Sequence, residues 1–116
     1  MGDLSSNFSR EEFECNCGCG FDDVVIALVD VLQEAREELG CPITVTSACR
    51  CKEYNSKVSV ASKSQHLLGT AADIQVSGCT PDYVYKYFND KYPNKYGIGK
   101  YKSFVHIDVR RRKARW

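Results

Sequence analysis

The sequence predicts an α+β domain built on a small, mostly antiparallel sheet with flanking helices. Three observations support this fold class. The chain has 116 residues, the length of one domain, and its 43% hydrophobic and 27% charged residues are typical of a folded protein with its own core. Its segments follow the order helix, strand, helix, strand, helix, strand. It contains no repeat and no linker, so we expect a single domain over residues 1–116.

The first segment, residues 1–20, has no periodic apolar pattern and is expected to be an irregular arm, anchored by Asn7-Phe8 and Phe13. It contains Cys15, Cys17 and Cys19, whose spacing differs from the C-x-x-C of zinc knuckles and redox sites. We interpret most of the seven cysteines as small buried hydrophobic residues. A structural zinc at the arm and disulfides formed outside the cell are the alternatives. The other four are Cys41, Cys49, Cys51 and Cys79.

The next segment, residues 22–39, is predicted to be a helix. Asp22 or Asp23 can cap its start, and Gly40 stands where a left-handed residue commonly ends a helix. A β-branched run over residues 43–47 then predicts a strand. The buried face of the helix is predicted from apolar residues at helical spacing: Val25, Leu28, Val29, Leu32, Ala35 and Leu39.

The middle of the chain is expected to hold a short helix over residues 51–58 and a small, polar loop over residues 59–66. Residues 70–76 predict a second strand, because their side chains alternate in polarity. Thr80-Pro81 then marks a helix start, with threonine as the cap and proline at the first helical position.

The last helix is expected to end before Pro93. Residues 97–99, Gly-Ile-Gly, predict a turn or a bulged strand. Residues 104–109 predict a third strand, because apolar and polar side chains alternate strictly along it. All three predicted strands are short, which favours a small sheet.

Charge is distributed unevenly along the chain. Residues 110–116 carry five Lys or Arg and no acid, so the rest sums to 11 − 15 = −4. We interpret residues 111–116 as a basic tail that solvates the chain end, with weak binding to an anionic wall polymer or lipid as the alternative. The acidic body, without interleaved aromatic and basic residues, argues against specific nucleic-acid binding.

No membrane-spanning or secretory segment is expected. No apolar run reaches the ~18–20 residues needed to cross a bilayer. The first fifteen residues also lack the apolar stretch of a secretory signal. We therefore expect synthesis in the cytoplasm without a signal peptide.

The two histidines, His66 and His106, are the only imidazoles in the chain. Alternation along the second and third strands places Asp73 and His106 on the sheet face opposite the β-branched residues. If the two strands are neighbours, the two side chains can lie within about 5 Å of each other. Gly69 lets the chain turn sharply, so His66 can fold back over the start of the second strand.

Two imidazoles and one carboxylate form a ligand set that zinc accepts, with an open fourth position for water. Such a site would perform hydrolysis, because bound zinc acidifies water and polarises a carbonyl. The alternative is that both histidines are structural or surface residues and that Asp73 caps a neighbouring segment. Spacing alone does not separate the two interpretations.

Four segments, in order, resemble the M15 family of zinc peptidases, the D-Ala-D-Ala carboxypeptidase-like enzymes. Residues 64–74, SQHLLGTAADI, resemble the S-x-H-x-x-G-x-A-x-D signature, and residues 104–108, FVHID, resemble the strand with the last ligand. Residues 47–50, SACR, are similar to the S-x-x-R segment, and the arm is similar to the start of short phage and prophage members. The resemblance covers about residues 7–110. It implies a hedgehog/DD-peptidase-like α+β fold.

The resemblance also implies site residues and one catalytic Zn2+. His66, Asp73 and His106 match the three zinc ligands. Arg50 matches the arginine that holds a substrate carboxylate or carbonyl oxygen, and a surface salt bridge is its alternative role. Ser64 matches the motif serine, which contacts substrate, orients a ligand or caps the loop.

The catalytic base departs from the family pattern. Many relatives carry an acid three residues before the last histidine, where this chain has Ser103. Asp108, two residues beyond His106, is the nearest candidate base, and a hydrogen-bond partner of the zinc site is its alternative role. The Tyr101 hydroxyl is a candidate substrate contact, with a packed aromatic as the alternative.

The expected function is therefore that of a zinc metallopeptidase that cleaves a peptide bond in the peptidoglycan stem or cross-link. Carboxypeptidase and endopeptidase activity both occur in the family, and a short chain of this kind suits a phage or prophage lysin acting at the bacterial cell wall. The alternative is a non-catalytic zinc-containing binding module of the same fold, as in the signalling domain of hedgehog proteins. The absent acid at Ser103 favours that alternative.

Overall fold

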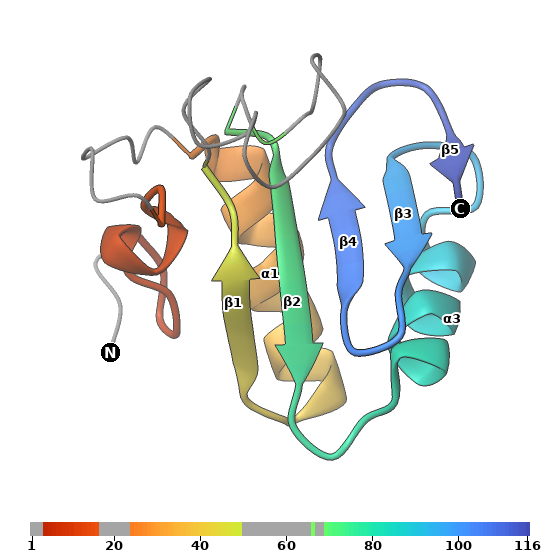
Figure 1. Cartoon of the computed structure of the whole chain (residues 1–116), viewed down its shortest axis with the longest axis horizontal. Coiled ribbons are helices and arrows are strands. Elements are labelled where there is room, and N and C mark those ends of the chain that lie inside the picture. The colour runs from red at the N-terminus through yellow and green to blue at the C-terminus, as the bar shows by residue number, and fades with distance from the viewer. Residues whose placement is uncertain (1–3, 17–23, 50–65, 67–68) are drawn as a thin grey trace.

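The computed structural model describes residues 4–16, 24–49, 66 and 69–116. Within them a five-stranded sheet in the order β1-β2-β4-β3-β5 carries helices α1 and α3 behind it, as Figure 1 shows. Its pairs are antiparallel except β3 with β5, which are parallel. The predicted α+β class with a mostly antiparallel sheet is confirmed. The elements are η1 (Arg10–Phe13), α1 (Ile26–Leu39), β1 (Ile43–Ser47), β2 (Ala71–Val76), α3 (Pro81–Lys91), β3 (Gly97–Lys100), β4 (Val105–Asp108) and β5 (Ala114–Arg115).

The hydrophobic core lies between the sheet and the two helices. Strand alternation directs every second side chain of β2 and β4 toward that core, as predicted, and leaves the polar side chains on the front face. Helical spacing does the same for one face of α1. The largest fully buried side chains of this core include Leu28, Leu32, Ile74, Phe88, Ile98, Val105 and Ile107.

Helix α1 begins at Ile26, so the predicted start at residue 22 is wrong, and the candidate caps Asp22 and Asp23 lie outside the described residues. Val25 occupies the cap position in an extended conformation. Its backbone N–H donates to the Gly69 carbonyl at 3.0 Å, in the turn before β2. This bond holds Val25 in an extended conformation, so the helix begins only after it. The other end agrees with prediction, because Gly40 closes the helix with a left-handed φ of 66°.

The N-terminal arm is fixed to the body by the predicted anchors. Phe8 and Phe13 are buried in the core, and Phe13 lies in the short helix η1. The Gln33 side chain of α1 exchanges two hydrogen bonds with Asn7, at 2.8 and 2.9 Å. Of the cysteines, Cys15 and Cys49 are buried, and Cys41 and Cys79 are half-buried free thiols.

Helix α3 begins as the sequence predicts. The Thr80 hydroxyl accepts the Tyr83 backbone N–H at 3.2 Å, and Pro81 stands at the first helical position. The helix ends at Lys91, before Pro93. None of the helices in the described part of the chain is long and apolar enough to cross a bilayer.

Strands β3 and β5 correct the sequence prediction. Residues 97–99 lie in strand β3, neither a turn nor a bulge, because β4 and β5 pair with its two edges. The tail is only partly a solvated end. β5 pairs with β3, and the Arg115 guanidinium donates to Asn89 Oδ1 and to the carbonyls of Tyr92 and Tyr96 at 2.6–2.7 Å. The Arg115 guanidinium thus satisfies acceptors in the last turn of α3 and just beyond its end.

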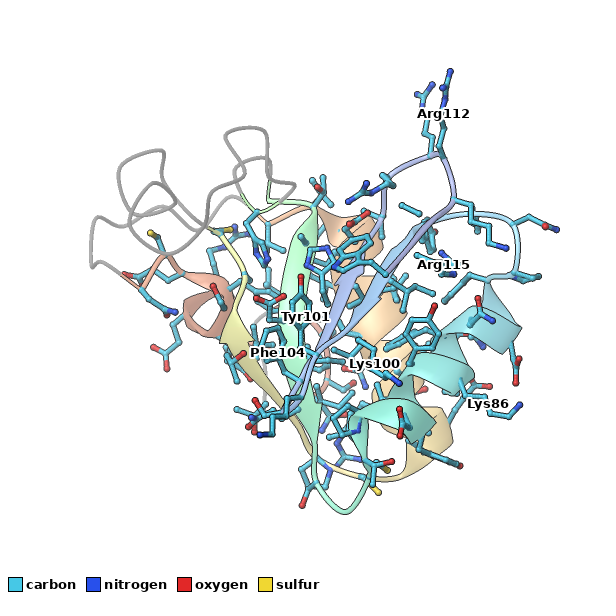
Figure 2. All side chains as sticks on the ribbon, turned by 45° about the vertical axis from the view of Figure 1, so that its right-hand side comes forward. Lys86, Lys100, Tyr101, Phe104, Arg112 and Arg115 are labelled. Atoms are coloured by element: carbon cyan, nitrogen blue, oxygen red, sulfur yellow. The ribbon has the colours of Figure 1, made fainter. Side chains whose placement is uncertain are left out.

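The exposed part of the basic tail is the loop between β4 and β5. Arg112 projects away from the body there (Figure 2). The expected short helix over residues 51–58 and the loop up to residue 65 lie outside the described residues. Arg50 and Ser64 lie outside them as well.

Candidate metal centre

Neighbouring strands bring Asp73 and His106 together on the front face of the sheet. β2 and β4 pair antiparallel with Asp73 directly opposite His106. The His106 Nδ1 atom lies 3.2 Å from Asp73 Oδ1, and both residues are buried. The juxtaposition predicted from strand alternation is confirmed.

His66 folds back onto the same carboxylate. Gly69 adopts a left-handed φ of 71°, which glycine reaches without strain, and its N–H points at the His66 carbonyl at 3.4 Å. The His66 Nε2 atom lies 3.3 Å from Asp73 Oδ1. The fold-back predicted for this histidine is therefore confirmed.

A hydrogen bond at the other nitrogen fixes the tautomer of each imidazole. The Ala48 carbonyl lies 2.6 Å from His66 Nδ1 and can only accept, so Nδ1 carries the hydrogen and Nε2 presents its lone pair. The Asp108 carboxylate lies 2.7 Å from His106 Nε2, so that nitrogen donates and Nδ1 presents its lone pair. The two rings expose different nitrogens, and both face the same Asp73 oxygen.

The charges of the group suit a cation. Burial raises the pKa of Asp73, but its contacts with the His106 and His66 imidazoles outweigh this effect and hold the pKa at about 2. Burial lowers the pKa of His106, but its contacts with Asp108 and Asp73 raise the pKa above the usual value, so without a metal a second proton on Nδ1 is favoured, which a bound cation would displace. At neutral pH an ionised carboxylate thus lies between two ring nitrogens.

Two of the three ligand spacings match those around a tetrahedral metal ion. The candidate ligand atoms of His66, Asp73 and His106 all lie within 4.8 Å of one another. Zinc binds nitrogen and oxygen at about 2.0–2.2 Å, which places neighbouring tetrahedral ligands about 3.3 Å apart. The two nitrogen-to-oxygen distances, 3.2 and 3.3 Å, match this spacing. These three residues could hold a divalent metal.

Hydrogen bonds fix the Asp108 carboxylate from several directions. It is fully buried, and the Arg110 guanidinium donates to both of its oxygens at 2.7 Å. The backbone N–H groups of Gly97 and Arg110 also donate to it, each at 3.1 Å. Burial raises the pKa of Asp108, but the bonds to His106 and Arg110 hold it well below its usual range. This environment keeps Asp108 ionised and its carboxylate in one orientation.

Two residues beside the site, Arg110 and Trp116, were missed from the sequence. Arg110 holds Asp108, and the Trp116 ring lies 5.0 Å from the His106 ring. The sequence feature that could have indicated them is the pair of glycines in β3. A Cβ at Gly97 would clash with the Asp108 carboxylate, and a Cβ at Gly99 would clash with the Trp116 indole. Two glycines two positions apart leave one strand face bare for large neighbours.

The structure describes some of the other residues expected near the site and leaves others undescribed. The Tyr101 hydroxyl accepts the Trp116 indole N–H at 2.8 Å, and Trp116 in turn contacts the His106 ring. Ser103 is exposed in the turn before β4, and its carbonyl accepts the Gln75 side chain at 3.1 Å. Arg50 and Ser64 stay predictions, because the structure does not describe them.

The comparisons with known proteins agree with this geometry. A family model described as Peptidase M15 matches residues 6–108. The matched range contains most of the arm, all three candidate ligands and Asp108. No curated protein matches the sequence.

Proposed function

Because the chain belongs to the peptidase M15 family, we propose that it is a zinc-dependent peptidase that hydrolyses a peptide bond in peptidoglycan. One observation carries the proposal. His66 Nε2 and His106 Nδ1 lie 3.3 and 3.2 Å from one Asp73 oxygen, with the other nitrogen of each ring already hydrogen-bonded. Such orientation of ligands is typical of sites that bind zinc.

Zinc bound there would lower the pKa of a coordinated water to about 7 and polarise the substrate carbonyl. His66, Asp73 and His106 would supply two neutral nitrogens and one negative oxygen, which leaves a fourth position for water and substrate. Arg50 remains our candidate for holding a substrate oxygen, and Ser64 for contacting substrate or orienting a ligand.

Asp108 is better suited to position His106 than to act as the base. Its carboxylate accepts hydrogen bonds from His106, from Arg110 and from two backbone N–H groups. A base that takes a proton from water would have to give up part of this network. We therefore assign Asp108 the role of a positioning residue that presents Nδ1 of His106 to the metal.

Our proposals for the substrate class and the place of action rest on family membership. Peptidoglycan stem peptides are the substrate class that membership suggests, either at a terminal D-Ala or within the stem or cross-link. The protein would act at the bacterial cell wall, as a phage or prophage lysin does. The exposed basic loop around Arg112 would add weak attraction to anionic wall polymers.

A second candidate is a zinc-containing binding module that does not hydrolyse its ligand. Ser103 stands where many relatives carry an acid, and Asp108 is fully occupied by its partners. Among the described residues, these two observations leave no carboxylate assigned as the base.

Digestion of purified peptidoglycan separates the two candidates. Fragments would be identified by mass spectrometry after incubation with the zinc-loaded protein, with the chelated protein and with His106→Ala. Defined stem-peptide fragments that disappear in the last two reactions support the peptidase and identify the bond. No fragments from a folded, zinc-loaded protein across several wall types would reject it in favour of the binding module.

A further inference from the structure

Trp116 lies in the same transverse row of the sheet as two of the candidate metal ligands, Asp73 and His106. Asp73 of β2 pairs with His106 of β4, and His106 pairs with Gly99 of β3. Trp116 follows β5 and continues this row beyond Gly99. Its N–H donates to the Ile98 carbonyl at 3.1 Å, and its carbonyl accepts the Lys100 N–H at 2.8 Å. Figure 1 shows this end of the chain beside β3.

The bare backbone of Gly99 lets the indole pack against the sheet next to His106. Any side chain at that position would occupy the space of the indole ring. The Trp116 and His106 rings are 5.0 Å apart at 48°. Trp116 nevertheless keeps 45% of its surface exposed, so it forms a wall beside the metal centre.

Two further aromatic residues extend this wall along the β3–β4 hairpin. The Tyr101 and Phe104 rings stack at 4.5 Å, nearly parallel (Figure 2). The Tyr101 hydroxyl accepts the Trp116 Nε1–H, which fixes both rings relative to each other. Tyr101 is 42% exposed. Trp116, Tyr101 and Phe104 together form what we call the aromatic wall.

The chemistry of the wall selects its ligand. The indole N–H is already bonded to Tyr101, and the Arg110 guanidinium lies over the indole ring at 5.3 Å. A second cation at this ring would meet the charge of Arg110. A carboxylate would find no N–H donor on the indole, and Arg110 is already paired with the Asp108 carboxylate through two hydrogen bonds. The remaining surface favours an uncharged alkyl group packed against the ring. The Tyr101 hydroxyl can still donate its own hydrogen to a neighbouring carbonyl.

We propose that Trp116 is a specificity-determining residue, whose exposed face receives the alkyl side chain of a substrate residue next to the scissile bond. This inference rests on the proposed peptidase function. Tyr101 positions the indole and donates its hydroxyl hydrogen to the substrate backbone. The site would discriminate by the presence of an aliphatic side chain rather than by charge.

The first test is a kinetic one with synthetic stem peptides. The peptide cut in the digestion experiment would be compared with two versions in which the residue on either side of the bond is glycine. The wild-type protein should prefer one alkyl-bearing peptide over its glycine version by about tenfold in kcat/KM, the effect expected of a small apolar contact. Trp116→Ala should reduce that preference to less than about twofold, and Trp116→Phe should restore most of it.

The second test needs no hydrolysis. Trp116 is the only tryptophan in the chain, so its fluorescence reports on this wall alone. Product peptides bound to the zinc-loaded protein should shield it from acrylamide, and glycine versions should shield it less. If no bond is cut, the intact stem peptide serves as the probe. Equal zinc content and melting temperature in each variant confirm folding, and Tyr83→Ala, an exposed aromatic on α3, is the matched control.

The outcomes are distinct. Hydrolysis with an unchanged alkyl preference in Trp116→Ala overturns the specificity role and leaves the peptidase standing. Absent hydrolysis, together with shielding of Trp116 by the stem peptide, rejects the peptidase and retains the contact. Hydrolysis without any shielding by alkyl-bearing products also overturns the inference.

Discussion

Replacing Asp108 by asparagine tests the orientation of His106. The side chain keeps its shape, but one oxygen becomes an NH2 group that faces the Arg110 guanidinium in either orientation, and at the Oδ2 position it faces the His106 N–H as well. Either choice sets donor against donor inside a fully buried position. In the wild-type protein the carboxylate accepts one hydrogen bond of 2.7 Å from His106 and two hydrogen bonds of 2.7 Å from Arg110.

The expected losses can be stated separately for stability and for metal. A hydrogen bond to a charged group is worth about 1.5–3 kcal/mol, and Arg110 is about a third exposed, so solvent replaces part of its loss. We expect Asp108→Asn to lower the free energy of unfolding by about 2 kcal/mol. Loss of such a partner of a metal-bound histidine typically costs about 10–100-fold in metal affinity.

Competition with a chromophoric zinc chelator measures the affinity, and calorimetry measures the stability. The matched control is Asp82→Asn, whose carboxylate pairs with Lys100 at the surface. Zinc affinity of Asp108→Asn within about twofold of wild type would refute the positioning role. If zinc-saturated Asp108→Asn instead loses kcat by more than about 100-fold, at the scale of a general base, Asp108 acts as that base.

Three further predictions concern the surroundings of the site. Gly97→Ala should displace the Asp108 carboxylate, so we expect a loss of about 1–3 kcal/mol in unfolding free energy, measured with denaturant, and weaker zinc binding; an unchanged midpoint would contradict this. Chelation should lower the melting temperature reversibly, because zinc at 100 times its dissociation constant adds about 2.7 kcal/mol; His66→Ala should show no such shift. Glutamine at residues 111–113 should weaken binding to intact cell walls at low salt without changing the melting temperature; equal binding would remove the basic loop from the account.

The candidate metal centre was predictable because two of its residues follow strand periodicity. Asp73 lies between Ala72 and Ile74, and His106 between Val105 and Ile107, so the alternation that buries these apolar neighbours places both polar side chains on the front face. Gly69 marks the turn that returns His66 to the same place. Local pattern and tertiary position agree at all three residues.

The remaining features depend on contacts between distant segments. The start of α1 is set by a hydrogen bond from Val25 to Gly69, and no local pattern near the helix contains that bond. The pairing of β5 depends on the bonds from Arg115 to carbonyls beyond α3. A run of basic residues does not by itself indicate a half-buried, hydrogen-bonded guanidinium, so the tail was interpreted as solvated.

The role of Trp116 could be recognised only from the partner strand. The sequence presents Gly97 and Gly99 as turn formers, because glycine is common in turns. In the structure their missing side chains make room for Asp108 and for the indole of Trp116. The identity of a residue was in this case set by the volume of its neighbours rather than by its own backbone conformation.

Titration of the metal-free protein with zinc, while fragment release from peptidoglycan is followed, tests the central claim most directly. The account predicts no release without metal, a rise in proportion to zinc bound, and saturation at one equivalent per chain. His66→Ala and His106→Ala should neither retain that equivalent nor release fragments. Full release from the metal-free protein, or one tightly bound zinc with no release from any wall type, would contradict it.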